Sequence, residues 1–151
     1  MFLPFSFHCL VTFCASIAST QAHTGQASRA QVCEEIAAEA IAQDVDPVLA
    51  VAVAWRESAF TRSAVSSAGA VGPLQVMPQF WCKSKPCDYI EAGIRALKHY
   101  TERHGLDDGL CAYASGRRCR FAGKQSRRYL RDVRRLFDKF SGFYLEACDG
   151  C

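Results

Sequence analysis

The 151-residue chain is 50% hydrophobic and 22% charged, with a net charge of +3, which excludes a disordered or fibrous protein. Its length suits one domain with a hydrophobic core of its own. Nine cysteines in so short a chain favour an exported, disulfide-bonded protein.

The N-terminal segment has the pattern of a secretory signal peptide. Residues 1–18 contain no acid and no Lys or Arg, and a small, polar stretch follows, although the usual positive start is missing. We assign residues 1–22 to the signal peptide, with cleavage after Ala18 or Ala22. A membrane anchor is the alternative, but it needs about 18 apolar residues, and polar side chains interrupt this run. The prediction is export to the periplasm or the extracellular space, with one mature domain over residues 23–151.

Helical periodicity accounts for the first half of the mature chain. Residues 29–43 are Ala-rich and place apolar side chains on one helical face. A second helix is predicted from Pro47 to about Phe60, because Asp46 suits an N-cap and proline suits the first helical position. Residues 48–55 carry no polar side chain, which predicts a buried helix.

The second half continues with a loop and more helices. Residues 61–80 are rich in Gly, Pro and Ser and are expected to form a loop, with one helical turn near Gln75. Helices are then predicted over residues 89–104, between an Asp88 cap and Gly105, over 107–114, and over 125–141, where Gly142 is the stop signal. No alternating strand pattern occurs, so the predicted fold class is all-α, in one compact domain.

The cysteine count leaves the disulfide connectivity open. Removal of the signal peptide takes away two cysteines, and an odd number, seven, remains. A Cys111–Cys119 bridge is plausible because a Gly-containing turn lies between the two residues. Cys87 has two candidate partners, Cys82 and Cys33.

A zinc site is the competing interpretation for some of these thiols. Cys148 and Cys151 have metal-like spacing, but no second close pair and no nearby His accompany them. We therefore predict neither a metal nor an organic cofactor.

Basic residues gather late in the chain. Residues 117–139 hold ten Lys or Arg and two Asp. A solvated helix face explains such a cluster, and an anionic wall polymer or lipid headgroups are alternative partners. Nucleic acid is not an expected partner of an exported protein.

Glu57 stands at the end of the predicted buried helix and shares a face with Val53 and Leu49. In one interpretation it is a surface residue paired with Arg56 or Arg62. In the other, apolar surroundings raise the pKa of its carboxyl, which can then act as a general acid near neutral pH. Periodicity alone does not choose between them.

The segment that follows resembles the core motif of lytic transglycosylases of the soluble-lytic-transglycosylase type, in order and in spacing. The matching positions are Glu57, Ser58, Ser66, Gly69, Ala70, Gly72, Gln75, Met77 and Pro78. Later matches are Ile90, Gly93, Leu97, Ala112, Tyr113, Gly116, Tyr129 and Val133. The sequence departs from the family pattern at Ser67, Pro73, Leu74, Ala114 and Ser115. The likeness covers about residues 31–137.

This resemblance implies a lysozyme-like helical domain that cuts the β-1,4 bond between N-acetylmuramic acid and N-acetylglucosamine in peptidoglycan. Glu57 would protonate the glycosidic oxygen and then take the proton of the muramoyl C6 hydroxyl, which leaves a 1,6-anhydro product. The other residues that the resemblance places at the substrate are Ser66, Gln75, Met77, Tyr113 and Tyr129. Ala114 replaces the family's Asn, and a Cys111–Cys119 bridge is a candidate replacement for the local bonding of that Asn.

The predicted partners are peptidoglycan glycan strands, and we expect a monomer. The small size, the cysteines and the signal peptide suggest the branch that accompanies secretion, conjugation or pilus machines, while phage-encoded and free-standing wall enzymes remain open. Two alternative functions have different requirements. A hydrolytic muramidase on the same fold needs a second carboxylate, and a non-catalytic wall-binding or assembly protein has no need of Glu57.

Overall fold

The computed structural model describes residues 6–20 and 25–149, and helices dominate both stretches. The helices are α1 (Phe7–Ala18), α2 (Gln26–Ala42), α3 (Pro47–Ser58), α4 (Pro78–Trp81), α5 (Tyr89–His104), α6 (Leu106–Ser115), the 3-10 helix η1 (Cys119–Phe121) and α7 (Lys124–Asp149). The described residues form no β-strand, only isolated bridges within the loop over 65–76. The all-α prediction is confirmed.

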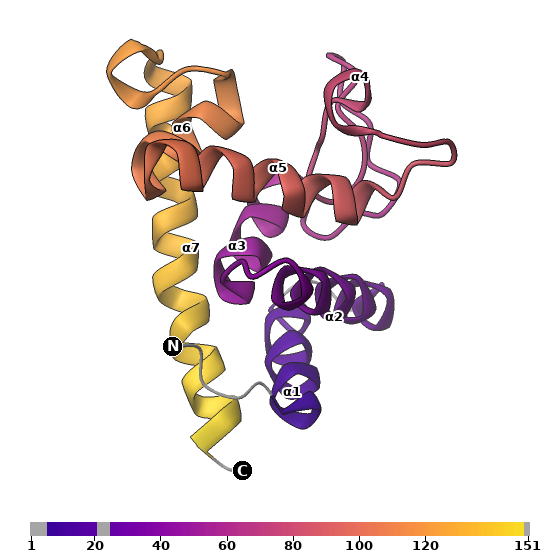
Figure 1. Cartoon of the computed structure of the whole chain (residues 1–151). Helices are drawn as coiled ribbons and strands as arrows, with labels where there is room; N and C mark the ends of the chain where they lie inside the picture. The colour runs from indigo at the N-terminus through magenta and orange to yellow at the C-terminus, as the bar shows by residue number, and fades with distance from the viewer. Residues whose placement is uncertain (1–5, 21–24, 150–151) are drawn as a thin grey trace.

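Helix α3 lies at the centre, with α2 and α7 packed against it and α5 crossing above it (Figure 1). All of its residues 47–54 are buried, which explains why this helix is apolar on every side. Its predicted start is confirmed, because the Asp46 side chain accepts the backbone N–H groups of Val48 and Leu49. The central helix therefore has a fixed beginning, and its far end faces the loop that connects it to α4.

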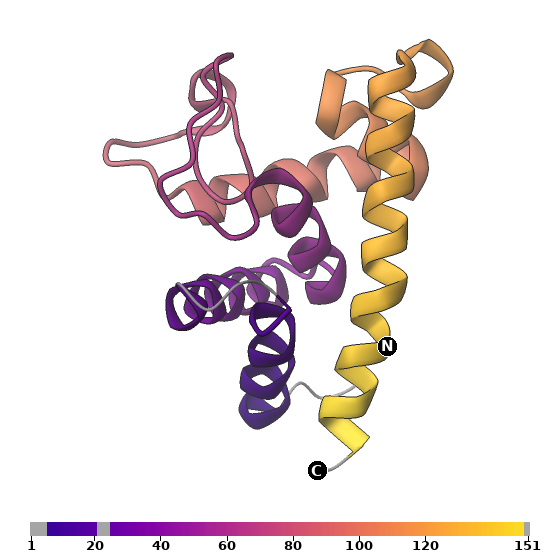
Figure 2. The same ribbon diagram turned by 180° about the vertical axis from the view of Figure 1, so that it is seen from behind.

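Helix α7 is longer than predicted. The expected stop at Gly142 is wrong, since the helix continues to Asp149 along the length of the domain (Figure 2). Beyond the glycine, Tyr144 is buried and meets the ring of Phe13 edge to face at 5.7 Å. Burial of such a ring contributes roughly 1.5–3 kcal/mol, which outweighs the cost of about 1 kcal/mol for a helical glycine.

Helix α1 lies within the segment assigned to the signal peptide, residues 1–22. In the whole chain it packs on α2 and α7 and buries Phe13, Cys14 and Ile17. A disulfide joins Cys14 to Cys33 of α2. Removal of this segment remains a prediction, and the candidate cleavage residue Ala22 lies outside the described residues.

Two further disulfides fasten loops. Cys87 pairs with Cys82 rather than with Cys33, and the Cys111–Cys119 bridge is formed as predicted. Within the described ranges, no three His, Cys, Asp or Glu side chains gather as a metal site would require. No described helix is both long and apolar enough to cross a membrane.

The loop over 61–77 differs from expectation in one detail. The predicted helical turn near Gln75 is displaced, because the short helix α4 begins only at Pro78. Gln75 itself has a left-handed backbone, with φ of 50°. A tight turn at Gln75, rather than a helical one, directs the chain toward α4.

Candidate active site

Glu57 is the second-last residue of α3 and is half-buried. The helix ends there because Ala59 and Phe60 adopt left-handed backbone conformations, with φ of 48° and 64°. The hydroxyl of Ser58 donates a hydrogen bond of 2.8 Å to the carbonyl of Pro73. This bond ties the end of α3 to the loop and fixes the position of the carboxyl group.

The surroundings of Glu57 favour its neutral form. Burial raises the pKa of the carboxyl from 4.5 to about 7, and the Tyr129 hydroxyl and the Arg56 charge offset part of this rise. Arg56 also forms an ion pair with Asp132, with 3.0 Å between Nε and Oδ2. A substantial fraction of Glu57 is therefore protonated at neutral pH, as an acid catalyst requires.

Two tyrosines flank Glu57. Burial, followed by the charge of Glu57, raises the pKa of both Tyr113 and Tyr129. The Tyr113 hydroxyl donates a 2.5 Å hydrogen bond to the carbonyl of Leu74. The buried Tyr129 hydroxyl makes no hydrogen bond of regular length and angle to a described residue, although it is near enough to Glu57 to lower the pKa of that carboxyl. Its proton is thus available to the Glu57 carboxylate.

Two adjoining hollows contain the tyrosines that interact with Glu57. One, of about 330 Å³, is lined by Gln75, Val76, Met77, Phe80, Trp81, Ala96, Tyr100, Tyr113, Ala114, Ser115 and Gly116. The other, of about 390 Å³, is lined by Arg56, Ala114, Ser115, Gln125, Ser126, Arg128 and Tyr129. They share Ala114 and Ser115, and each contains one of the tyrosines that flank Glu57. We call the pair the groove. Glu57 lines neither half, but it interacts with Tyr113 of the first half and Tyr129 of the second, and its neighbour Arg56 lines the second half.

The predicted site residues fall into two groups. Gln75 and Met77 line the groove together with Tyr113, and the Gln75 amide donates to the carbonyl oxygens of Gly72 and Ala64 at 2.9 and 3.2 Å. Ser66 lines neither half of the groove, and its hydroxyl accepts the backbone N–H of Ala70 at 3.0 Å. Gln75 and Ser66 thus stabilise the loop, and their contacts with substrate remain predictions.

Aromatic groove residues were missed by the sequence analysis. Phe80 is 75% exposed, and Trp81 meets Tyr100 at 5.8 Å between ring centroids. Tyr100 in turn meets Tyr113 at 6.3 Å. Such rings offer apolar faces to a sugar. The adjacent aromatic pair Phe80–Trp81, two residues after Pro78, was the one available signal.

The chain also matches a protein-family model, that of the transglycosylase SLT domain, over residues 34–133. This range is more than half of the chain and includes Glu57, all the other predicted site residues and the aromatic groove residues. The chain belongs to the transglycosylase SLT domain family. Lytic transglycosylases of this family act on peptidoglycan, which is therefore the substrate of this SLT domain. Comparisons with curated proteins and with solved structures gave no match.

Four other carboxylates of the SLT domain have structural roles. Asp46 and Asp88 cap the N-termini of α3 and α5. Asp107 pairs with Arg134, and Asp108 accepts the backbone N–H of Cys119 at 2.9 Å. Within the described residues, no Asp or Glu lines either half of the groove, and Glu57 itself stands behind its two tyrosines, Tyr113 and Tyr129.

Proposed function

We propose that this SLT domain cleaves the β-1,4 bond between N-acetylmuramic acid and N-acetylglucosamine by lytic transglycosylation, with Glu57 as both acid and base. The observation that carries the proposal is a single carboxyl that interacts with one tyrosine from each half of the groove and has its pKa raised by burial to about 7. Inverting and retaining hydrolases use two carboxyl groups, about 5–9.5 Å apart. An intramolecular nucleophile removes the need for the second one.

The reaction would run in two proton transfers. Protonated Glu57 donates its proton to the glycosidic oxygen as the bond from that oxygen to the muramoyl C1 breaks. The resulting carboxylate takes the proton of the C6 hydroxyl, and the C6 oxygen forms a new bond to C1. The sugar leaves as its 1,6-anhydro form, and Glu57 is protonated again. Holding both reacting atoms in one sugar corresponds to an effective concentration of about 10⁵ M or more.

Neighbouring groups support the intermediate carboxylate. Arg56 and Tyr129 both lower the pKa of Glu57, so they stabilise the charge that Glu57 carries between the two steps. The Tyr113 hydroxyl is held by the carbonyl of Leu74, and its ring can orient the sugar in the first half of the groove. These contacts give Glu57 a pKa between that of a free acid and that of a fully buried one.

Mass spectrometry of peptidoglycan digested by the purified protein tests the proposal. We expect products that are lighter by one water than hydrolysed fragments, and no products from Glu57→Gln. General acid–base catalysis contributes about 10²–10⁴-fold, which sets the minimum loss expected for the variant. Reducing-end muramic acid as the main product would indicate a hydrolase, and equal lysis by both proteins would exclude the catalytic role of Glu57.

We also propose that the domain acts as a monomer in the periplasm or outside the cell. Its substrate lies beyond the cytoplasmic membrane, and the two disulfides outside the predicted signal peptide, Cys82–Cys87 and Cys111–Cys119, are typical of an oxidising compartment. Association with a secretion, conjugation or pilus complex is part of the same proposal, which rests on the sequence resemblance. Fractionation of cells that express the tagged full chain, with and without reducing agent, tests the compartment.

A further inference from the structure

A cationic pocket adjoins the groove at the end of α6. It has a volume of about 460 Å³ and is lined by His104, Gly116, Arg117, Arg118 and Phe121. Gly116 also lines the first half of the groove, so the two hollows meet at that residue. The pocket is lined by no acid among the described residues. We call it the arginine pocket.

The charges of this pocket are not neutralised within the domain. Arg117 and Arg118 are exposed, and neither forms an ion pair in the part of the chain that the structure describes. The two acids at the start of α6 are engaged elsewhere, because Asp107 pairs with an α7 arginine and Asp108 accepts the backbone N–H of Cys119. An anionic ligand would therefore meet two available guanidinium groups.

The loop that carries the arginines is held in place before any ligand arrives. The Cys111–Cys119 disulfide closes it, and Gly116 turns the chain with a φ of 73°. The Ser115 hydroxyl accepts the backbone N–H of Arg117 at 3.3 Å. A preorganised loop loses less conformational entropy on binding than a mobile one, so its contacts translate more fully into affinity.

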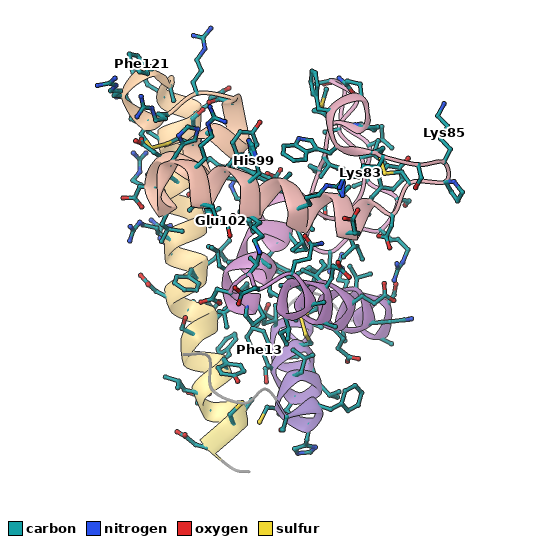
Figure 3. All side chains as sticks on the ribbon, viewed as in Figure 1. Phe13, Lys83, Lys85, His99, Glu102 and Phe121 are labelled. Atoms are coloured by element: carbon teal, nitrogen blue, oxygen red, sulfur yellow. A yellow bond between two sulfur atoms is a disulfide. The ribbon has the colours of Figure 1, made fainter. Side chains whose placement is uncertain are left out.

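The tip of the same loop offers an apolar surface. Phe121 is 59% exposed and projects at the end of the molecule where α7 begins (Figure 3). The Arg120 guanidinium lies over its ring, 4.4 Å from the centroid. The pocket therefore combines cations with one aromatic face, which suits a short peptide with carboxylates and methyl groups.

We infer that the arginine pocket binds a carboxylate of the peptide stem on a muramoyl residue whose sugar lies in the groove. The inference rests on the proposed function and adds to it a preference for stem-bearing glycan over bare glycan. In peptidoglycan the short, anionic stems are attached to the muramoyl sugars, so a stem must leave the groove close to the bound chain. Guanidinium groups recognise carboxylates through paired hydrogen bonds, and the pocket opens directly beside the groove.

The test compares two substrates and three proteins. Peptidoglycan is used intact or after an amidase has removed the stems, and kcat/KM for anhydro-product release is measured on both. Arg117→Gln/Arg118→Gln is compared with the wild type and with Arg127→Gln/Arg131→Gln, which removes the same charge from exposed positions of α7. We expect the pocket variant to lose about three- to tenfold on intact substrate, with no more than twofold change on stripped glycan. The α7 variant should keep the wild-type ratio.

The outcomes separate this inference from the proposed function. If anhydro products form but the pocket variant keeps the wild-type preference, or loses activity equally on both substrates, the inference is wrong and the proposed function stands. If the wild type releases no anhydro product from either substrate, the proposed function fails. Binding to anionic phospholipid vesicles that depends on Arg117 and Arg118, with an unchanged substrate ratio, would assign the pocket to a membrane surface instead.

Discussion

Burial of the ionisable Glu57 carboxyl has a cost in folding stability, and the Glu57→Gln variant allows this cost to be measured. Below pH 4.5 the carboxyl is protonated in both the folded and the unfolded chain. As the pH rises toward 7, the unfolded chain releases the proton while the folded chain retains it, so the wild type loses stability. The glutamine side chain does not titrate, so the variant does not undergo this loss of stability.

The size of the effect follows from the pKa values. A rise from 4.5 to about 7 corresponds to roughly 3 kcal/mol at about 1.36 kcal/mol per unit. Because the side chain is only half-buried and water screens part of the charge, we expect roughly 1–2 kcal/mol. The free energy of unfolding of Glu57→Gln minus that of the wild type should therefore increase by this amount between pH 4 and pH 8.5.

Urea unfolding at both pH values measures this difference, since titrations common to both proteins cancel. Glu146→Gln serves as the control, because it makes the same change at an exposed position of α7 that lines neither half of the groove. A pH-independent difference for Glu57→Gln would show that folding does not desolvate the carboxyl, and would remove the physical basis of the acid role.

The remaining predictions concern the same site and its support. The kcat/KM of the wild type should fall above about pH 7, because Glu57 loses its proton there. Tyr129→Phe should move this fall to higher pH, because the Tyr129 hydroxyl lowers the pKa of Glu57. A pH–rate profile of the wild type and the variant measures the shift. Gly93→Ala should destabilise the domain by roughly 1–3 kcal/mol through a steric clash, whereas Gly142→Ala, with open space around it, should stabilise it by roughly 0.5–1 kcal/mol; thermal melts with opposite signs are the check. Cys111→Ser/Cys119→Ser should cost about 2–3 kcal/mol in urea unfolding and lower activity on intact peptidoglycan, and unchanged activity would refute a role of this bridge in holding the loop.

Local chemistry made much of the helical framework predictable from the sequence. An aspartate followed by proline begins α3, and Asp88 and Gly105 bound α5 as expected. The end of α7 could not be predicted in this way. A helix continues past a glycine when burial of residues beyond it outweighs the cost of the glycine. Here Tyr144 packs against Phe13, a residue from the opposite end of the sequence that local patterns do not connect to it.

The same limit applies to the candidate site. The position of Glu57 after an apolar helix left two interpretations open, and the motif that follows it favoured the acid. Burial raises the pKa of this carboxyl, as that interpretation expects. The aromatic side of the groove comes from Trp81 on α4 and Tyr100 on α5, which no spacing rule connects. The hydrogen bond from the Ala70 backbone N–H to the Ser66 hydroxyl was equally out of reach, since a motif gives the order of residues and not the direction of a hydroxyl.

Contacts that do not line the groove fix the position of Glu57. Because Gly93 has no side chain, Leu74 can pack directly against it. A Cβ at residue 93 would lie only 2.5 Å from the Leu74 Cβ. The carbonyl of Leu74 accepts the Tyr113 hydroxyl, and the neighbouring carbonyl of Pro73 accepts the hydroxyl of Ser58, next to Glu57. One loop segment thus connects α5, α6 and the end of α3. A side chain at Gly93 would push this segment away, so Gly93→Ala should lower kcat as well as stability, even though the residue itself does not line the groove.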